Sequence, residues 1–365
     1  MNVSSHFVDY SFFFVGALLF SLLINGLLLR FSKTLGVRNH QATLVRWSST
    51  SKPSLGGLSF FIVFLAAFVG LPFFAPSDFS FFNLQAVGIM VAVIIGFLTG
   101  LFDDAYNTRP WLKFAGQLSC GLVLIVCGVY IQFFQLEYLN YLLTLFWVVG
   151  IMNSINMLDN MDGITGITSF GILGSMLGII FVSGQMSNPL GLIIIAIMGS
   201  LAGFLAYNWP PSKMYMGDTG SQFLGIILAG FGIIFLWNGG GQGTAISPLG
   251  SILMVATAFV LPLADTTTVF IKRISKGTSP FVGGKDHTTH HLCYAGLSER
   301  QVSTVFIIFS ILAALLTVCI FHQVLNLAAY GYLLYAAFPI AVFIFLFLVA
   351  VRPAPEKKSG NRSYL

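Results

Sequence analysis

Hydrophobic residues along this chain gather in long runs, and most charged residues lie in the short segments between them. About eleven runs approach the ~20 residues that an α-helix needs to cross the hydrocarbon core of a bilayer. They lie at about 11–30, 55–75, 86–102, 114–132, 138–157, 164–183, 189–207, 220–237, 248–270, 302–322 and 325–350. The pattern predicts an all-α, polytopic integral membrane protein with about eleven transmembrane helices.

The composition excludes an ordinary soluble domain. Of the 365 residues, 56% are hydrophobic and 8% are charged, whereas soluble domains carry about a quarter charged residues. The first run lacks a basic leader and is long enough to stay as a span, so no cleavable signal peptide is expected. Cys120, Cys127 and Cys319 fall in predicted spans and Cys293 in a loop, as expected of small packing residues rather than a disulfide framework.

The distribution of positive charge predicts the orientation in the membrane. All 17 Lys and Arg lie in alternate loops, at immediate helix ends such as Arg30, or in the C-terminal segment. Those segments are 31–54, 103–113, 208–219, 271–301 and 351–365. The positive-inside rule then places the N-terminus outside and the C-terminus in the cytoplasm. We expect one transmembrane domain over 1–350 and a short basic cytoplasmic tail over 351–365, and we interpret the net charge of +5 as a topology signal rather than as nucleic-acid binding.

Acidic residues concentrate on the same predicted side. Of the 12 acids, only Asp9, Asp78 and Glu137 fall outside. The aspartates at or near cytoplasmic helix ends are Asp103, Asp104, Asp159, Asp162, Asp218, Asp265 and Asp286. Carboxylates at membrane depth are costly and usually functional, and several on one face suggest a cation site. Hard oxygen ligands suit Mg²⁺, which takes one or two carboxylates together with substrate phosphates.

Two segments place carboxylates at helix ends. In G-L-F-D-D-A-Y-N-T-R-P, residues 100–110, repulsion between Asp103 and Asp104 can raise the proton affinity of one of them and prepare it as a general base. Lys113 and Gln117 follow on one face of the next helix. In Y-M-G-D-T-G-S, residues 215–221, Asp218 lies on a glycine-bounded turn before a helix, where it could hold a metal against a phosphate or simply cap the helix.

A dense polar run, N-S-I-N-M-L-D-N-M-D-G-I-T-G, occupies residues 153–166. Asn153, Asn156, Asp159 and Asp162 recur every three residues, so a helical turn would bring neighbouring members close together. Such amides and carboxylates could hydrogen-bond a base, a ribose or a sugar. The alternative is a polar helix cap and turn.

Three histidines lie in the loop at 273–291. His287, His290 and His291 do not have the spacing of a structural zinc site. With Arg273 and the neighbouring lysines, a diphosphate-binding loop is the stronger interpretation, and a flexible solvated loop is the alternative. Upstream, Asp265 could orient another group, carry a proton or pack helices.

Two further segments carry weaker signals. S-K-P-S-L-G-G-L, residues 51–58, is a basic turn with hydroxyl groups before the second predicted span. N-G-G-G-Q-G, residues 238–243, is expected to be a flexible linker.

These motifs, in this order over roughly residues 46–300, resemble the polyprenyl-phosphate N-acetylhexosamine-1-phosphate transferase family, glycosyltransferase family 4. It includes the phospho-N-acetylmuramoyl-pentapeptide transferase and the enzymes that start O-antigen, common-antigen and wall teichoic acid assembly. The resemblance implies transfer of a sugar 1-phosphate from a UDP-N-acetylhexosamine to undecaprenyl phosphate, with Mg²⁺ (or Mn²⁺) and release of UMP. It also implies a multi-pass, homodimeric protein of the cytoplasmic (inner) membrane.

The resemblance also implies roles for individual residues. Asp103 and Asp104 match paired aspartates, one of which deprotonates or positions the lipid phosphate. Asp218 matches the metal-holding aspartate of M-G-D-x-G-S, with Asp104 as a second metal ligand. The remaining matched residues are Asp159 and Asp162 for catalysis, and Lys113, Asn153, Asn156, Ser54, Arg273, His287, His290 and His291 for substrate binding.

The histidine segment departs from the family pattern. D-H-T-T-H-H differs from the tight triple-histidine motif of the pentapeptide enzymes and from the spacing in the antigen-initiating branch. This argues against a pentapeptide substrate. Arg273 and S-P-F at 279–281 look more like the antigen and teichoic-acid initiating branch, whose donor is commonly UDP-N-acetylglucosamine.

Two other functions are alternatives. An ion-coupled secondary transporter also uses intramembrane acids, but it predicts acids near mid-membrane and an internal repeat, and only Asp265 lies somewhat deep. A CDP-alcohol phosphatidyltransferase should carry a D-G-x-x-A-R run, and D-G-I-T-G-I-T does not continue that way.

Overall fold

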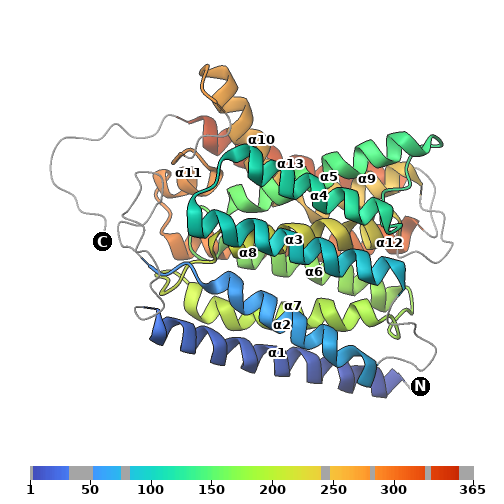
Figure 1. Ribbon diagram of the computed structural model, residues 1–365. Coiled ribbons are helices and arrows are strands. Elements are labelled where there is room, and N and C mark those ends of the chain that lie inside the picture. The colour runs from blue at the N-terminus through green and yellow to red at the C-terminus, as the bar shows by residue number, and fades with distance from the viewer. Residues whose placement is uncertain are drawn as a thin grey trace.

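The computed structural model describes residues 3–32, 52–74, 83–239, 247–279, 284–324 and 330–352. Within these ranges the chain is helical, and strand-like pairing is confined to one bridge between Ser54 and Tyr215. The elements are α1 (Val3–Phe31), α2 (Gly56–Gly70), η1 (Leu71–Phe73), α3 (Leu84–Tyr106), α4 (Pro110–Val126), α5 (Glu137–Leu158), α6 (Ile164–Val182), α7 (Pro189–Asn208), α8 (Gly217–Gly232), η2 (Ile233–Trp237), α9 (Pro248–Ala258), α10 (Val260–Ser275), α11 (Thr288–Tyr294), α12 (Glu299–Val324) and α13 (Tyr330–Val351). They form one elongated bundle (Figure 1).

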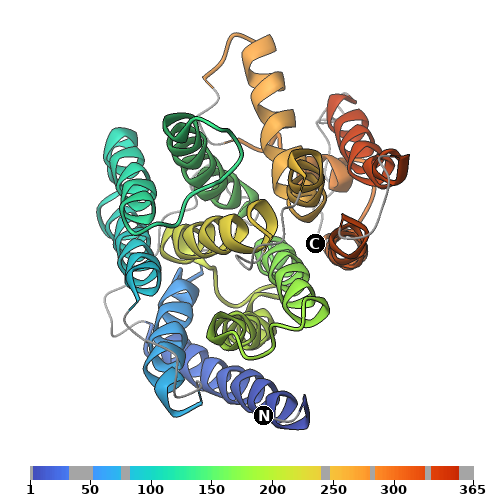
Figure 2. The ribbon, with the colours of Figure 1, turned by 90° about the vertical axis from the view of Figure 1, so that its right-hand side faces the viewer.

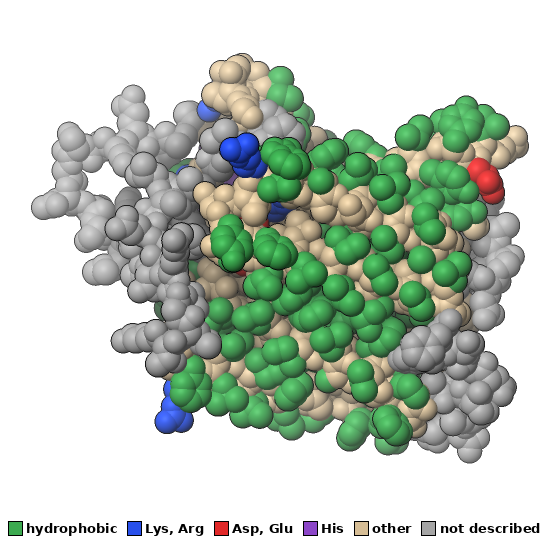
Figure 3. Space-filling model, in the orientation of Figure 1, with side chains coloured by type: hydrophobic (Ala, Val, Ile, Leu, Met, Phe, Trp, Pro, Cys, Tyr) green, Lys and Arg blue, Asp and Glu red, His purple; other side chains and the backbone are tan. Residues whose placement is uncertain are grey.

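The all-α membrane architecture is confirmed. In the part of the chain that is described, nine helices are long and apolar enough to cross a membrane, or ten if a bent pair counts as one span. Each predicted run corresponds to a helix or to a pair of consecutive helical elements. The helix α4, at 17 residues, falls just short of the length of a membrane span. On the face shown in Figure 3, hydrophobic side chains cover the flank, and Lys and Arg lie toward the end near α11.

The predicted span at 248–270 is wrong as a single helix. It breaks at Phe259 into α9 and α10, which differ in direction by 80°. The histidine segment was predicted as a loop, and the structure instead folds Thr288–Tyr294 into the short helix α11. Residues 353–365 of the predicted tail, Pro280 and Phe281 of S-P-F, and most of N-G-G-G-Q-G lie outside the described residues.

Helix α8 lies in the middle of the bundle (Figure 2), almost wholly buried, and packs against α2, α3, α5 and α6. Its sequence, G-D-T-G-S-Q-F-L-G-I-I-L-A-G-F-G, is rich in small residues, which let membrane helices approach closely. The beginning of α8 is also tied to the segment before α2. Tyr215 N donates to Pro53 O at 2.9 Å, and Gly57 N donates to Met216 O at 3.0 Å.

Two glycines let the first turn of α8 fit between its neighbours. A Cβ atom at Gly100 of α3 would lie 2.6 Å from the Asp218 carbonyl carbon, and one at Gly57 of α2 would lie 2.6 Å from Gly220 Cα. Both contacts are with backbone atoms, which cannot swing aside. The position of Asp218 therefore depends on the absence of side chains at Gly57 and Gly100.

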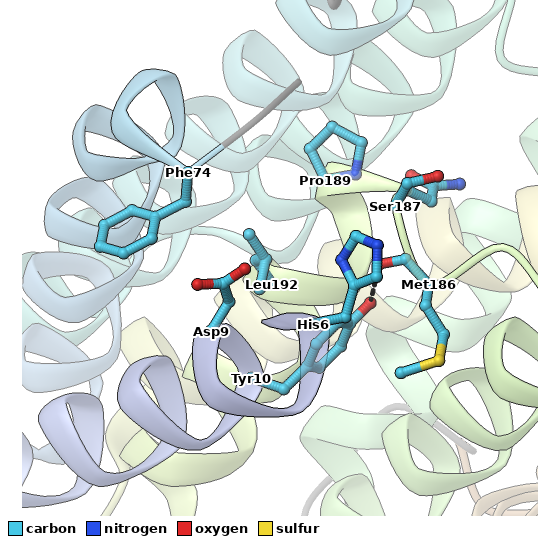
Figure 4. A pocket seen from close by; sticks show the side chains of 9 residues that line it. His6, Asp9, Tyr10, Phe74, Met186, Ser187, Pro189 and Leu192 are labelled. Atoms are coloured by element: carbon cyan, nitrogen blue, oxygen red, sulfur yellow. Dashed lines mark hydrogen bonds between the residues drawn. The ribbon is translucent and has the colours of Figure 1, made fainter. Parts of the chain in front are cut away.

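A small hollow lies between the beginning of α1 and the turn from α6 to α7 (Figure 4). There, Tyr10 Oη donates to Met186 O at 3.2 Å. Since α6 begins beside the end of α5 and runs away from it, this hollow is at the opposite end of the bundle from the beginning of α8.

Gly100→Ala should lower the thermal midpoint of the detergent-purified protein. The added methyl group would meet the backbone of Asp218 and Thr219, and overpacking of this kind costs about 1–3 kcal/mol. Gly150→Ala, on α5 with no atom within 4 Å of the new methyl group, is the matched control and should be neutral or slightly stabilising. Equal midpoints for the two variants would contradict the packing argument.

Candidate functional site

Lys113 lies where α3 and α5 end and α4 and α8 begin, a region that we call the site end of the bundle. Its Nζ donates to Asp103 Oδ2 at 2.9 Å, to Asn156 Oδ1 at 3.1 Å and to Asp218 Oδ2 at 3.1 Å. An ammonium group has three protons, and each finds an acceptor on a different helix. Residues far apart in the sequence thus converge on one cation.

Asp218 lies in the first turn of α8, directly after Gly217, whose φ of +77° favours glycine. Asn156 Nδ2 donates to Asp218 Oδ1 at 2.6 Å and to Ser221 Oγ at 2.8 Å, so Asn156 bonds both Lys113 and the first turn of α8. The Asp218 side chain remains 35% exposed, which leaves it accessible to a ligand.

The two adjacent aspartates have different partners. Asp103 accepts from Thr108 N at 3.0 Å and from Thr108 Oγ1 at 2.6 Å, in addition to Lys113. Asp104 accepts from Asp218 N at 3.0 Å, Thr219 N at 2.8 Å and Thr219 Oγ1 at 2.6 Å. Asp104 therefore caps the N-terminus of α8 from a neighbouring helix, where a negative charge is favourable.

Asp104, predicted as a catalytic residue and a metal ligand, lies against the beginning of α8. Both of its oxygens accept hydrogen bonds there, from the α8 backbone and from the Thr219 hydroxyl. Of the adjacent pair, Asp103 is the one whose carboxylate bonds Lys113.

Asp162 belongs to a second polar group. Lys52 Nζ lies 3.3 Å from Asp162 Oδ2 and donates to Ser212 Oγ at 3.0 Å, and Ser212 N donates to Asp162 Oδ2 at 2.8 Å. Lys52 also lies 5.1 Å from the centre of the Tyr215 ring. The sequence did not single out Lys52 and Ser212 as partners of Asp162, because both are far from it along the chain.

Ser54, Asp159 and Asn153 occupy separate positions. Ser54 pairs with Tyr215 just before Gly217, and Asp159 is half-buried at the end of α5. The Asn153 amide pairs with the amide of Gln117, to which Asn153 Nδ2 donates at 2.8 Å. Asn153 was predicted to bind substrate. Its amide instead bonds Gln117, which lies one helical turn deeper in the bundle than Lys113.

The histidine segment is anchored on Asp265. Asp265 Oδ2 lies 2.8 Å from His287 Nδ1, and its Oδ1 accepts from Thr288 N at 2.8 Å and from Thr288 Oγ1 at 2.7 Å. Asp265 is fully buried. Among the roles left open for Asp265, these bonds support that of orienting another group, the beginning of α11.

Arg273 is oriented by a two-point bond to Asp286. Its Nε and Nη2 donate to the two carboxylate oxygens at 2.8 Å and 2.7 Å. Burial alone would raise the pKa of Asp286, but the Arg273 hydrogen bonds and charge outweigh it, and the pKa lies below its usual range. The guanidinium of Arg273 is thus held in one orientation at the end of α10.

The other two histidines are neutral at pH 7. Burial and the nearby His287 lower the pKa of His290 to about 4. Burial and the Lys272 ammonium, whose Nζ lies 2.7 Å from His291 Nε2, lower the pKa of His291 to about 4. Neither His290 nor His291 therefore adds a positive charge to this segment.

Asn160 links the histidine segment to the end of α5. Thr289 Oγ1 donates to Asn160 Oδ1 at 2.5 Å, and His290 Nε2 lies 3.4 Å from Asn160 O. Asn156 is one turn earlier on α5, so the histidine segment and the Lys113 group share a support. Asn160 and Thr289 were not among the predicted site residues, although both lie inside the polar segments at 153–166 and 273–291.

The Lys113 group is suited to binding anions and cations together. Lys113 offers a positive charge, and three side-chain oxygens from Asp103, Asn156 and Asp218 surround it. Within the described ranges, no three His, Cys, Asp or Glu side chains are placed to hold a metal ion by themselves. A metal here would need further ligands from a bound molecule, as Mg²⁺ commonly does.

Asp104→Asn should lower the thermal midpoint of the purified protein. The amide would turn a donor toward N–H or O–H groups that now donate to a carboxylate, and an unmatched buried group costs about 1–3 kcal/mol. Glu137→Gln, an exposed acid in the first turn of α5, is the matched control and should change stability by less than about 0.5 kcal/mol. A midpoint of Asp104→Asn equal to that of the control would exclude the capping role.

The free energy of unfolding should fall as the pH is lowered from about 6.5 to 4. A histidine has a pKa near 6.5 in the unfolded chain and about 4 at His290, so in this window the unfolded state binds more protons. Thermal midpoints measured across this range should therefore fall less steeply for His290→Gln than for the wild type. His322→Gln, an exposed histidine on α12, should keep the wild-type slope. Identical slopes for all three proteins would refute this origin.

Known proteins resemble this chain over most of its length. Residues 86–236 match the family model described as glycosyl transferase family 4. The chain is 30% identical over 277 residues to the decaprenyl-phosphate N-acetylglucosaminephosphotransferase of Mycobacterium leprae, covering 69% of each chain. It is 28% identical over 276 residues to the probable undecaprenyl-phosphate N-acetylglucosaminyl 1-phosphate transferase of Bacillus subtilis, covering 72% of this chain and 73% of the relative.

A third relative is more distant. The phospho-N-acetylmuramoyl-pentapeptide-transferase of Latilactobacillus sakei is 25% identical over 286 residues, covering 74% of this chain and 84% of the relative. The matched residues 86–236 contain Asp103, Lys113, Asn156 and Asp218, the four residues that meet at the site end. This chain belongs to glycosyl transferase family 4.

Proposed function

We propose that this protein transfers N-acetylglucosamine 1-phosphate from UDP-N-acetylglucosamine to undecaprenyl phosphate, with release of UMP. The observation that carries the proposal is the Lys113 ammonium, held among Asp103, Asn156 and Asp218 where four apolar helices end or begin. A lipid phosphate, whose tail stays in hydrocarbon, and a soluble nucleotide sugar can both reach such a layer. None of the relatives reported above is a transporter.

The choice of sugar follows the relatives. The proteins of M. leprae and B. subtilis are both named for N-acetylglucosamine, and the muramoyl-pentapeptide relative is less similar in sequence. The spacing in D-H-T-T-H-H also departs from the pentapeptide enzymes. The product would begin a cell-envelope polysaccharide.

Asp103 and Lys113 are placed for the transfer itself. Asp103 would take a proton from the lipid phosphate, one oxygen of which then bonds to the phosphorus that bears the sugar. The bond from that phosphorus to the bridging oxygen breaks, and UMP leaves with the electron pair. Lys113, close to the developing charge, would stabilise the transition state. Asp104 contributes by holding the α8 terminus.

Mg²⁺ is the proposed cofactor, with Mn²⁺ as an alternative. Asp218 and Asn156 fit the role of its protein ligands, because both carry a side-chain oxygen beside Lys113 and because Asp218 is partly exposed. Asp104, predicted as a second ligand, lies against the same turn of α8. Substrate phosphates would complete the ligand set. When bound, the ion would neutralise charge on the diphosphate.

The remaining predicted residues surround this centre. We assign Ser54, Asp159 and Asp162, with Lys52 beside Asp162, to the nucleotide side of the site. Arg273, His287, His290 and His291 would face the sugar diphosphate, and His290 and His291, neutral at pH 7, would act as hydrogen-bonding groups rather than as cations.

The cellular setting completes the proposal. We place the site end at the cytoplasmic face of the cytoplasmic membrane, with the N-terminus outside. We also propose a single transmembrane domain over 1–350, a basic tail over 351–365, and a homodimer.

The purified protein should release UMP when it is given UDP-N-acetylglucosamine, undecaprenyl phosphate and Mg²⁺, and the release should require all three. Asp218→Asn and Lys113→Met should each lower kcat by about 10²-fold or more, because each loses charge at the transferring phosphate. Asp9→Asn, a carboxylate-to-amide change at the opposite end of the bundle, is the control and should keep wild-type turnover. Lack of lipid-dependent UMP release would refute the proposed function. Full activity of Asp218→Asn would refute the role of Asp218 as a metal ligand.

A further inference from the structure

A layer of amide side chains lies one helical turn deeper in the bundle than the Lys113 group. Its members are Gln117 on α4, Asn153 on α5 and Gln222 on α8, which we call the amide layer. Because α4 and α8 begin at the site end and α5 ends there, a shift of three or four residues on each helix moves about 4.5–6 Å inward. Each helix of the layer thus carries one amide and, one turn away, one site residue.

Gln117 connects the layer. Asn153 Nδ2 donates to Gln117 Oε1 at 2.8 Å, and Gln117 Nε2 lies 3.3 Å from Asn153 Oδ1, which makes a reciprocal amide pair. Gln117 Nε2 also donates to Gln222 Oε1 at 3.0 Å. The Gln117 side chain on α4 is therefore bonded at both of its polar atoms. Its oxygen accepts from α5, and its nitrogen bonds both α5 and α8.

Bonds of this kind specify the axial register of helices. A buried amide loses its partner if a helix shifts by part of a turn, so hydrogen bonds between amides on different helices add to close packing in favouring one register. An unmatched amide in hydrocarbon is costly. The amide layer therefore favours one relative height of α4, α5 and α8.

The same relative height is what Lys113 needs. Its Nζ reaches Asn156 on α5 and Asp218 on α8, both at 3.1 Å, from a third helix. A displacement of about 1 Å at a reacting group can cost about 10²-fold in rate. Gln117 and Gln222 are 1% and 0% exposed, so a substrate in the Lys113 group would not touch them directly.

We propose that Gln117, Asn153 and Gln222 are positioning residues that set the register of α4, α5 and α8 and thereby hold Lys113 against Asn156 and Asp218. The inference rests on the proposed function for the reaction that is being positioned. It assigns a role to Gln117 and Gln222, and it gives Asn153 a supporting role in place of direct substrate binding.

The test replaces the whole layer with apolar side chains of similar size, in the variant Gln117→Met/Asn153→Leu/Gln222→Met. Removing all the partners together leaves few unmatched groups, so the protein should fold with a thermal midpoint close to that of the wild type. UMP release should nevertheless show kcat lowered by about tenfold, with the KM for UDP-N-acetylglucosamine within about threefold, because the nucleotide side of the site is untouched. Gln222→Met alone should also lower kcat. This single variant replaces the triple variant in the test if the triple variant does not fold.

The control is Thr144→Val, which removes a buried hydroxyl from α5 far from the site, where Ile131 N donates to Thr144 Oγ1 at 2.9 Å. It should lower the thermal midpoint and leave kcat unchanged, which separates a loss of stability from a loss of positioning. A kcat within twofold of the wild type in the folded triple variant, or in Gln222→Met, would overturn the inference and leave the proposed function intact. A wild-type protein that releases no UMP would instead overturn the proposed function.

Discussion

A lysine ammonium at the end of an apolar bundle is the constraint on which the site depends. Away from bulk water, the charge of Lys113 is tolerated only if acceptors surround it, and they come from Asp103, Asn156 and Asp218 on three other helices. Satisfying one cation therefore fixes four helix ends relative to one another. A phosphate-transfer site also requires a positive charge, so the same placement of Lys113 serves both the packing of the helix ends and the chemistry.

Neighbouring residues hold in place the helix ends that meet at Lys113. Asp104 caps α8, whose first turn carries Asp218, and Gly57 and Gly100, which have no side chains, leave room for that turn. On the other side, Asn160 connects the end of α5 to Thr289, so that the histidine segment rests on the helix that carries Asn156. Supports of this sort involve no contact with a substrate, yet they decide where each reactive atom lies.

The sequence predicted the helices and the clustering of aspartates well, because hydrophobic runs and helix-end charges are local features. It could not assign partners. Adjacent residues on a helix point about 100° apart, so Asp103 and Asp104 face different neighbours rather than each other. Lys52 and Asp162, a bonded pair, are separated along the chain by 110 positions. The break at Phe259 was also missed, because hydropathy measures how apolar a segment is and not the direction in which it runs.

The central position of α8 has a consequence for how the protein is made. Helices emerge from the ribosome in chain order, and α3, α4 and α5 precede α8, which must end up enclosed by α2, α3, α5 and α6. Until α8 is in place, Lys113 lacks one acceptor and Asp104 has no helix to cap. Insertion of α8 thus completes a half-formed charge network. The energy of that network favours retaining in the bundle a helix that has an aspartate in its first turn.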